Sequence, residues 1–187
     1  NSGKKTNRSW YYVSHHSYNI NKFALTADKL GQKKIYLLRM GKTAKKDANI
    51  ASKFFIDYAN SELRSDLMDI YLASNCVFGM GGGTGSKGAA LVFRKPLLHL
   101  ISDIHEFRTY QEDNLLLSKR YYSKNKKRCL TLQEILNFKY GTLSHRNQLD
   151  KEEIEMIECS EQELADASME MIDRIDKKWT DSKEIKK

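Results

Sequence analysis

Short apolar runs alternate with amphipathic segments along the first hundred residues. Five of the runs are continuously apolar, which predicts buried strands over residues 10–13, 35–38, 54–56, 76–78 and 97–101. Apolar positions repeating every three or four residues predict intervening helices over residues 20–30, 63–71 and 88–94. Gly31 follows the first helix, where a terminating glycine is common. Alternation of this kind predicts an α/β fold, a doubly wound parallel sheet with helices on both faces.

Regular signals are sparser after residue 101. Residues 102–130 are basic, and we expect them to be irregular. Two capping boxes, in which a Ser or Thr is followed three residues later by Glu, predict helix starts at Thr131 and Ser160. The second box opens a helix that we expect to pack on the sheet or on a neighbouring domain, through an apolar face made of Leu164, Ala167, Met171 and Ile175.

We expect one domain over residues 9–176, because 187 residues suffice for a single core. The chain begins with Asn rather than Met, so residues 1–8 are expected to be a disordered or linker end of a fragment. Residues 177–187 are expected to form a frayed polar tail. The three cysteines are far apart and lack zinc or CxxC spacing, which predicts free thiols in a reducing compartment. No apolar run approaches the length of a membrane span.

The net charge of +8 is unevenly distributed along the chain. Basic residues concentrate in 1–53 and 119–147, and acidic residues concentrate in 150–176. A basic face suits phosphate, whether it belongs to a nucleotide, a lipid headgroup or nucleic acid. An ordinary solvated surface explains the same distribution equally well.

Residues 76–96, CVFGMGGGTGSKGAALVFRKP, place six glycines within ten positions between a predicted strand and a predicted helix. The P-loop pattern fails twice, because Ser86 replaces its second glycine and Gly88 replaces the Ser or Thr that holds magnesium. The dinucleotide pattern G-x-G-x-x-G matches at Gly83, Gly85 and Gly88, but at the fourth strand rather than the first. Inward N–H groups, the helix N-terminus and the hydroxyls of Thr84 and Ser86 would suit phosphate. A tight strand-to-helix turn is the alternative.

Further candidate residues follow other strands of the predicted sheet, whose ligands bind beyond the carboxyl ends of the strands. Arg39 and Lys42 follow the second strand and suit phosphate, with a structural ion pair as the alternative for Arg39. His15 and His16 follow the first strand, where ordinary loop histidines are the alternative. The segment Arg64-Ser65-Asp66 opens the second helix, where an acidic residue is favourable without any function.

Several stretches share a more specific pattern, above all DYANSELRSDLMDIYL at residues 57–72. The others are YNIN (18–21) with its helix, LRMGK (38–42), the Thr84-Gly85 turn, FRKP (93–96) and the helix from ELADA (163–167) to Trp179. In these stretches the sequence resembles the C-terminal part of a bacterial glycosyltransferase family that is encoded with surface-polysaccharide genes. Gly81 and Gly82 depart from the family, whose Gly-Thr-Gly turn is usually less glycine-rich before the Thr.

The resemblance implies a GT-B-like architecture, in which two Rossmann-like domains face each other and the C-terminal one binds a nucleotide-sugar donor. The N-terminal acceptor domain, which often supplies the base, would then be missing from this chain. The implied reaction transfers the sugar to a glycan or lipid-linked acceptor in the biosynthesis of surface polysaccharide such as lipopolysaccharide. It would take place in the cytoplasm or at the inner face of the cell membrane, where the basic surface is compatible with a peripheral contact with anionic lipid.

Site residues can be assigned within this interpretation. No Asp-x-Asp motif is present, so the sequence requires neither a metal nor another cofactor. The donor diphosphate would be bound by Arg39, the strongest candidate, together with Lys42, Gly83, Thr84, Gly85 and Ser86. No catalytic base is assigned. Further candidates for the donor site are His15, Arg64, Ser65, Asp66 and Asp103, of which His15, Asp66 and Asp103 could act as a base.

Three other functions remain open on the sequence alone. A nucleotide-sugar epimerase has the same paired-domain architecture and would differ in its products. A non-catalytic regulatory or scaffolding module would retain the fold without turnover. The basic regions also suggest a nucleic-acid binder, but no base-stacking motif supports one, and we expect no nucleic-acid partner.

Overall fold

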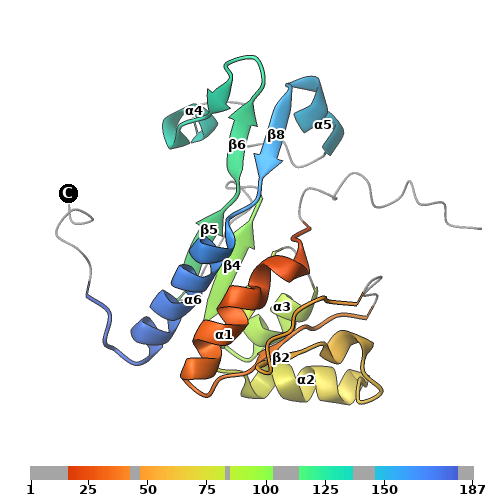
Figure 1. Ribbon diagram of the computed structural model, residues 1–187. Coiled ribbons are helices and arrows are strands. Elements are labelled where there is room, and N and C mark those ends of the chain that lie inside the picture. The colour runs from red at the N-terminus through yellow and green to blue at the C-terminus, as the bar shows by residue number, and fades with distance from the viewer. Residues whose placement is uncertain (1–16, 43–46, 83–84, 103–113, 137–145, 181–187) are drawn as a thin grey trace, which may run out of the picture.

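The computed structural model describes residues 17–42, 47–82, 85–102, 114–136 and 146–180, which form a main body and a small lobe (Figure 1). The small lobe is the part between residues 120 and 157. The predicted strand at 10–13 lies outside the described residues.

Parallel strands form the centre of the main body. β1 (Leu37–Leu38) pairs with β2 (Phe55–Ile56) in one two-stranded sheet. β3 (Gly79–Gly81), β4 (Leu97–Ile101) and β5 (Leu115–Ser118) pair in that order in a second, three-stranded sheet. Every residue of β4 is buried, as expected of a central strand that is covered on both faces.

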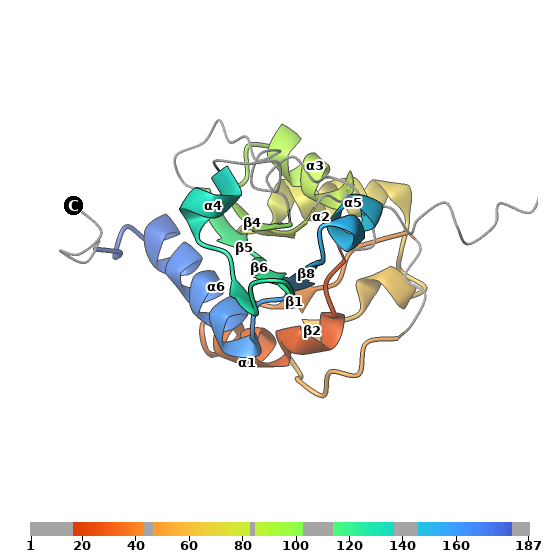
Figure 2. The ribbon, with the colours of Figure 1, turned by 90° about the horizontal axis from the view of Figure 1, so that it is seen from above.

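Helices cover both faces of the central sheet (Figures 1 and 2). On one face, α1 (Ala24–Gln32), which continues the 3-10 helix η2 (Ile20–Phe23), packs against α6 (Glu161–Ile175). On the other face lie α2 (Asp66–Asn75) and α3 (Gly85–Val92). The core beneath α1 and α6 includes Phe23, Leu98, Leu100, Leu164 and Met171. The prediction of a mixed α/β fold with parallel strands is therefore confirmed.

Several predicted element boundaries are wrong: the helices expected over 63–71 and 88–94 are shifted in α2 and α3, and two further differences lie at glycines with close contacts. The predicted strand at 76–78 lies too early, because β3 begins at Gly79. A Cβ atom on Gly79 would lie 2.7 Å from Leu97 Cδ2 and 3.1 Å from Ala90 Cβ, so this glycine lets α3 approach the sheet. Gly31 does not terminate α1 but lies inside it, where a Cβ would meet the ring of Phe54.

Residues 114–130 are not irregular, which corrects the prediction for 102–130. They contain β5 and two strands of the small lobe, β6 (Arg120–Ser123) and β7 (Arg128–Cys129). The lobe is an antiparallel sheet in the order β7-β6-β8, with β8 at Ile154–Ile157. The helices α4 (Leu132–Leu136) and α5 (Arg146–Lys151) belong to the lobe, which has its own core of Tyr121, Leu130, Ile135, Leu149 and Ile154.

Both predicted capping boxes are confirmed. Ser160 Oγ accepts a hydrogen bond from Glu163 N at 3.2 Å, and Glu163 Oε2 accepts one from Ser160 N at 2.7 Å. Thr131 and Glu134 exchange the equivalent bonds at 3.2 and 2.8 Å. The helix that follows Ser160 packs on α1 and on the central sheet, and its residues Leu164 and Met171 are fully buried.

The first prediction concerns the glycines of β3 and α3. We expect Gly79→Ala to destabilise the chain by about 1–3 kcal/mol, because the buried Leu97 and Ala90 leave no room for a methyl group. Gly88→Ala is the control, since a Cβ there meets nothing within 4 Å and alanine favours a helix by about 0.5–1 kcal/mol. Urea unfolding of both variants measures the difference, and equal stabilities would contradict the packing argument.

The second prediction concerns acid stability of the small lobe. Glu134 accepts two hydrogen bonds from Arg128 at 2.8 Å, one from Lys126 Nζ at 2.7 Å and one from Thr131 N. The Arg128 guanidinium, followed by Lys126 and Thr131 N, holds the pKa of Glu134 well below its usual 4.5. A lowered pKa stabilises the folded lobe above pH 4.5, and this stabilisation disappears as the pH falls toward the lowered value.

We therefore expect Glu134→Gln to open the lobe severalfold more often than the wild type at pH 7, with the difference shrinking below pH 4.5. Hydrogen exchange of the Leu130 amide, which donates to Tyr121 O at 2.7 Å, reports this opening. Glu155→Gln, on an exposed position of β8, is the matched control. A variant difference that is independent of pH would contradict the assignment.

Candidate functional site

Arg39 lies directly after β1, beside the residue that follows β2. Its backbone N donates to Ile56 O and its carbonyl accepts from Ala59 N, both at 2.9 Å. Its Nη1 lies 3.1 Å from Asp57 Oδ2, and the two side chains are only 16% and 21% exposed. Arg39 therefore forms an ion pair within the fold, which is the alternative that the sequence left open for it.

Asp57 is the centre of a polar group that we call the edge cluster: Arg39, Asp47, Asp57 and Asn60. Asp57 Oδ2 accepts hydrogen bonds from Arg39 Nη1, Ala48 N and Asn60 Nδ2, each at 3.1 Å. Asn60 Nδ2 also donates to Asp47 Oδ1 at 3.1 Å. Asp57 Oδ1 is buried and has no hydrogen-bond partner among the described residues. The cluster thus joins the ends of β1 and β2 through one carboxylate.

Asp47, Asp57 and Asn60 were not identified as site residues from the sequence. A signal for Asp57 was present, because it directly follows the apolar run at 54–56 and opens the DYANS stretch. Asp47 carries no local signal, and only the folded chain brings it to Asn60. Lys42, three residues beyond Arg39, lies exposed to solvent.

The segment from Arg64 to Asp66 is built into the start of α2. Ser65 Oγ accepts from Met68 N at 3.1 Å and caps the helix. The hydroxyl of the buried Tyr58 accepts from Ser65 N at 3.2 Å and donates to Ser65 O at 3.3 Å. Burial raises the pKa of Tyr58, so that hydroxyl keeps its proton. Because Tyr58 begins the 3-10 helix η3 (Tyr58–Asn60), it links this segment to the edge cluster.

Arg64 lies just before α2 and pairs with two acidic residues of that helix. Its Nη2 lies 2.9 Å from Asp69 Oδ2 and 3.3 Å from Asp66 Oδ1. Asp66 is itself largely exposed at the first position of α2, where a negative charge interacts favourably with the helix dipole. These contacts give Arg64, Ser65 and Asp66 a local structural role at the helix start.

The glycine-rich turn connects β3 to α3. β3 and β4 are parallel and α3 forms the crossover between them, so the turn lies at the carboxyl end of β3. Gly85 begins α3, whose first backbone N–H groups have no partner within the helix. Those donors at a strand's carboxyl end form the arrangement that favours phosphate. Gly83 and Thr84 lie outside the described residues, as does the side chain of Ser86.

Gly88 distinguishes this turn from the dinucleotide fingerprint. In that fingerprint the third glycine allows close packing of the helix on the strand. A Cβ on Gly88 would meet no atom within 4 Å, so packing does not require a glycine there. Gly79 is the glycine that allows α3 to pack closely on the sheet. The match to G-x-G-x-x-G therefore does not reflect the packing role that its third glycine normally has.

The remaining candidates from the sequence are not placed. His15, His16 and Asp103 lie outside the described residues. Within the described ranges, no group of three or more His, Cys, Asp or Glu side chains is arranged to hold a metal ion. In those same ranges, no helix has both the length and the apolar character needed to cross a bilayer. The three cysteines form no disulfide.

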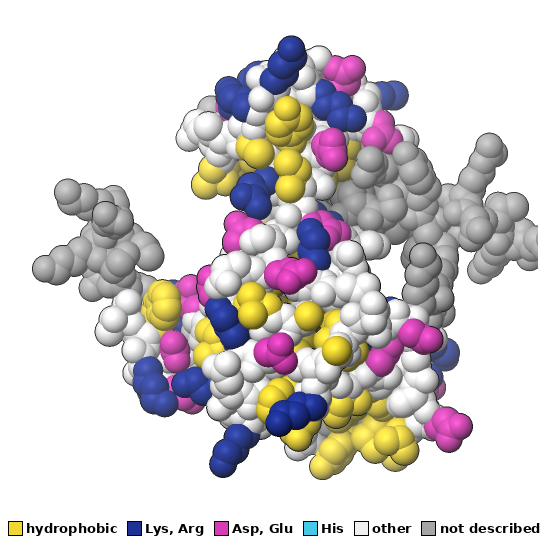
Figure 3. Space-filling model, viewed as in Figure 1, with side chains coloured by type: hydrophobic (Ala, Val, Ile, Leu, Met, Phe, Trp, Pro, Cys, Tyr) yellow, Lys and Arg dark blue, Asp and Glu magenta, His cyan; other side chains and the backbone are white. Residues whose placement is uncertain are grey.

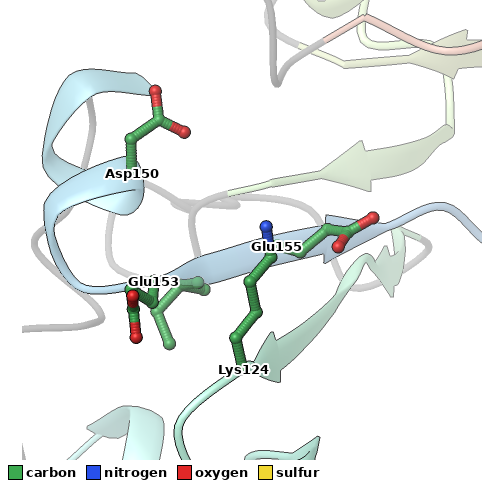
Figure 4. Close-up of a pocket in the computed structure, with 5 residues that line it drawn as sticks. Lys124, Asp150, Glu153 and Glu155 are labelled. Carbon is green, nitrogen blue, oxygen red and sulfur yellow. The ribbon is translucent and has the colours of Figure 1, made fainter.

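A pocket of about 410 Å³ lies in the small lobe (Figure 4). It is lined by Lys124, Asp150, Glu153, Ile154 and Glu155. Three carboxylates against one ammonium group make it unfavourable for phosphate. The candidate site for a phosphorylated ligand is therefore the carboxyl edge of the parallel strands, and not this pocket.

The third prediction tests the edge cluster. We expect Asp57→Ala to lower the free energy of unfolding by about 3 kcal/mol, because it removes the acceptor of three hydrogen bonds, one of them from the largely buried guanidinium of Arg39. Asp47→Ala removes one exposed acceptor and should cost less than about 1 kcal/mol. Chemical unfolding of the two variants gives both values. Similar losses would show that Asp57 does not organise the cluster.

Comparisons with known proteins found no relative of this chain. No family model, no curated protein and no solved structure gives a significant match to the chain. Any functional interpretation therefore depends on the arrangement of the described residues and on the sequence stretches quoted above.

Proposed function

We propose that this chain is the donor-binding domain of a glycosyltransferase and that it binds the diphosphate of a nucleoside-diphosphate sugar. The glycine-rich turn between β3 and α3 is the observation that carries the proposal. It stands at the carboxyl end of a parallel strand and at the N-terminus of the crossover helix. Backbone N–H groups and the helix dipole at such a position attract phosphate oxygens. The resemblance of residues 57–72 to a glycosyltransferase family supports the same class of ligand.

The proposed chemistry needs stabilisation of a leaving group. An acceptor hydroxyl attacks the anomeric carbon of the sugar, the bond from that carbon to the diphosphate breaks, and the bonding electrons leave with the diphosphate. Backbone N–H groups of the turn and of the first turn of α3 would stabilise the added negative charge, as an oxyanion hole does. The hydroxyl proton passes to a base that we do not assign.

Arg39 and Lys42 would contribute positive charge to the same ligand. Arg39 is paired with Asp57, so a phosphate would share its guanidinium with a carboxylate. A guanidinium has five N–H donors in a planar fork, which makes such sharing chemically feasible. Lys42 is exposed and carries less structural constraint, so it is the cleaner residue to test.

The fourth prediction is that one sugar nucleotide binds and stabilises the chain. A thermal-shift screen of UDP, GDP, CMP and ADP sugars should identify one that raises the melting temperature, because a ligand of the folded state stabilises by mass action. Titration calorimetry with that ligand should then give binding about tenfold weaker for Lys42→Glu, the loss expected for one charged contact. Lys151→Glu, an exposed substitution on α5, is the matched control.

Arg39→Ala belongs in the same titration, measured as affinity and not as melting temperature, because the variant also loses its ion pair with Asp57. The site assignment is wrong if no sugar nucleotide shifts the melting temperature, or if Lys42→Glu and Arg39→Ala both bind as the wild type does. Binding of a sugar nucleotide that is followed by neither transfer nor epimerisation would indicate a non-catalytic module.

A further inference from the structure

The outer surface of α2 and α3 is unusually apolar for a helix layer that faces solvent. Leu63, Leu67 and Val92 are 76%, 77% and 77% exposed. With six further exposed side chains they make up what we call the apolar face: Leu63, Leu67, Met68, Ile70, Tyr71, Val77, Leu91, Val92 and Phe93. The part over α2 is visible at the lower edge of Figure 3.

The apolar face is built on two adjacent helices: six of its residues lie on α2 or α3, and Leu63, Val77 and Phe93 lie in the chain next to the helix ends. On α2, residues 67, 70 and 71 share one side of the helix and are exposed. On α3, Val92 lies opposite the buried Ala90, which packs over Gly79 of the sheet. The two helices contact each other on the same face of the sheet. Their outward sides therefore form a single surface.

The size of this surface matches an interface between two proteins. Each of the nine side chains exposes on the order of 100 Å² of apolar area, so the whole face exposes roughly 900 Å². Exposed apolar patches on monomeric proteins rarely exceed a few hundred Å², whereas a stable interface buries about 800 Å² on each partner. A face of this size is expected to be covered.

Charges of opposite sign border the two ends of the face. Glu62 and Asp66 are exposed at the start of α2. Arg94 and Lys95 follow α3, and Gly79 N donates to Pro96 O at 2.9 Å, which places this basic step beside the chain that leaves α2. Along α2 the surface thus runs from acidic through apolar to basic.

We infer that the apolar face is the interface of a homodimer, in which a second copy of this chain packs with its α2 antiparallel to the first. A two-fold axis that passes through the middle of the face places the acidic end of each copy against the basic end of the other, so the same charge pairing occurs at both ends. The arrangement buries the apolar side chains and pairs the bordering charges. An anionic membrane would satisfy Arg94 and Lys95 but would repel Glu62 and Asp66, so the charge pattern favours a second copy.

Sedimentation velocity over about 1–300 µM of chain tests the inference, since an interface of this size supports a dissociation constant of about 1 µM or tighter. Leu67→Glu and Val92→Glu should each weaken the dimer by at least about tenfold, because each substitution occurs twice in a two-fold interface. Leu132→Glu, on the exposed side of α4 in the small lobe, is the matched control and should leave the dissociation constant unchanged. Circular dichroism verifies that every variant is folded.

A charge exchange tests the antiparallel pairing. Glu62→Lys with Asp66→Lys makes both ends basic, and Arg94→Glu with Lys95→Glu makes both ends acidic. Each double variant alone should dimerise at least about tenfold more weakly, and an equimolar mixture should form a heterodimer close to wild-type affinity. The inference is overturned if the wild type stays monomeric over the whole range, or if a dimer survives both apolar substitutions. A monomer that binds phosphatidylglycerol vesicles through Leu67 and Val92 would overturn it as well and would identify a lipid surface.

Discussion

The buried ammonium group of Lys119 holds the main body and the small lobe together. β5 ends at Ser118 and β6 begins at Arg120, so Lys119 is the one residue between the parallel and the antiparallel sheet. Its Nζ donates to Ser17 O, lies 4.2 Å from the centre of the Tyr18 ring and is 3.8 Å from Glu158 Oε1. A buried charge is tolerated only where such partners compensate for its lost hydration, so the junction is closely specified.

The chain passes between the main body and the small lobe twice, at Lys119 and at Glu158, and the contacts of Glu158 bring both crossings together. Glu158 follows β8 and precedes Cys159 and α6, accepts from Asn19 N at 3.3 Å, and lies 3.2 Å from Lys22 Nζ on η2. The carboxylate therefore fixes the start of α1 and of α6 relative to the lobe. Because β6 continues from the carboxyl end of β5, the lobe rises from the edge of the sheet where ligands of such folds bind (Figure 1). Tyr121 of the lobe also donates to the carbonyl of Ser102, directly after β4.

Elements with a local sequence signal were predicted correctly, and elements whose structure depends on contacts with residues far along the chain were missed. The strand at 97–101 and the helix after Ser160 were predicted correctly, because one is apolar at every position except His99 and the other opens with a capping box. The antiparallel sheet was missed, since Tyr121 pairs with Met156 far along the chain and neither segment is apolar enough to indicate a strand alone. The burial of Lys119 had no sequence signal, because lysine is almost never buried. For Arg39 the sequence left two roles open, phosphate binding and a structural ion pair, and the structure shows an ion pair with Asp57.

The glycine-rich stretch shows why density of a residue type is an uncertain guide to function. Gly79 and Gly81 belong to β3, and Gly79 is needed because Leu97 and Ala90 occupy the space of a side chain. Gly88 lies in α3 with open space around it. Packing and helix structure thus take up the ends of the stretch, because β3 ends at Gly81 and α3 begins at Gly85. The extra glycine at position 81, which departs from the family pattern, is a strand residue, so the case for phosphate binding depends on the short Gly-Thr-Gly turn and the helix N-terminus behind it.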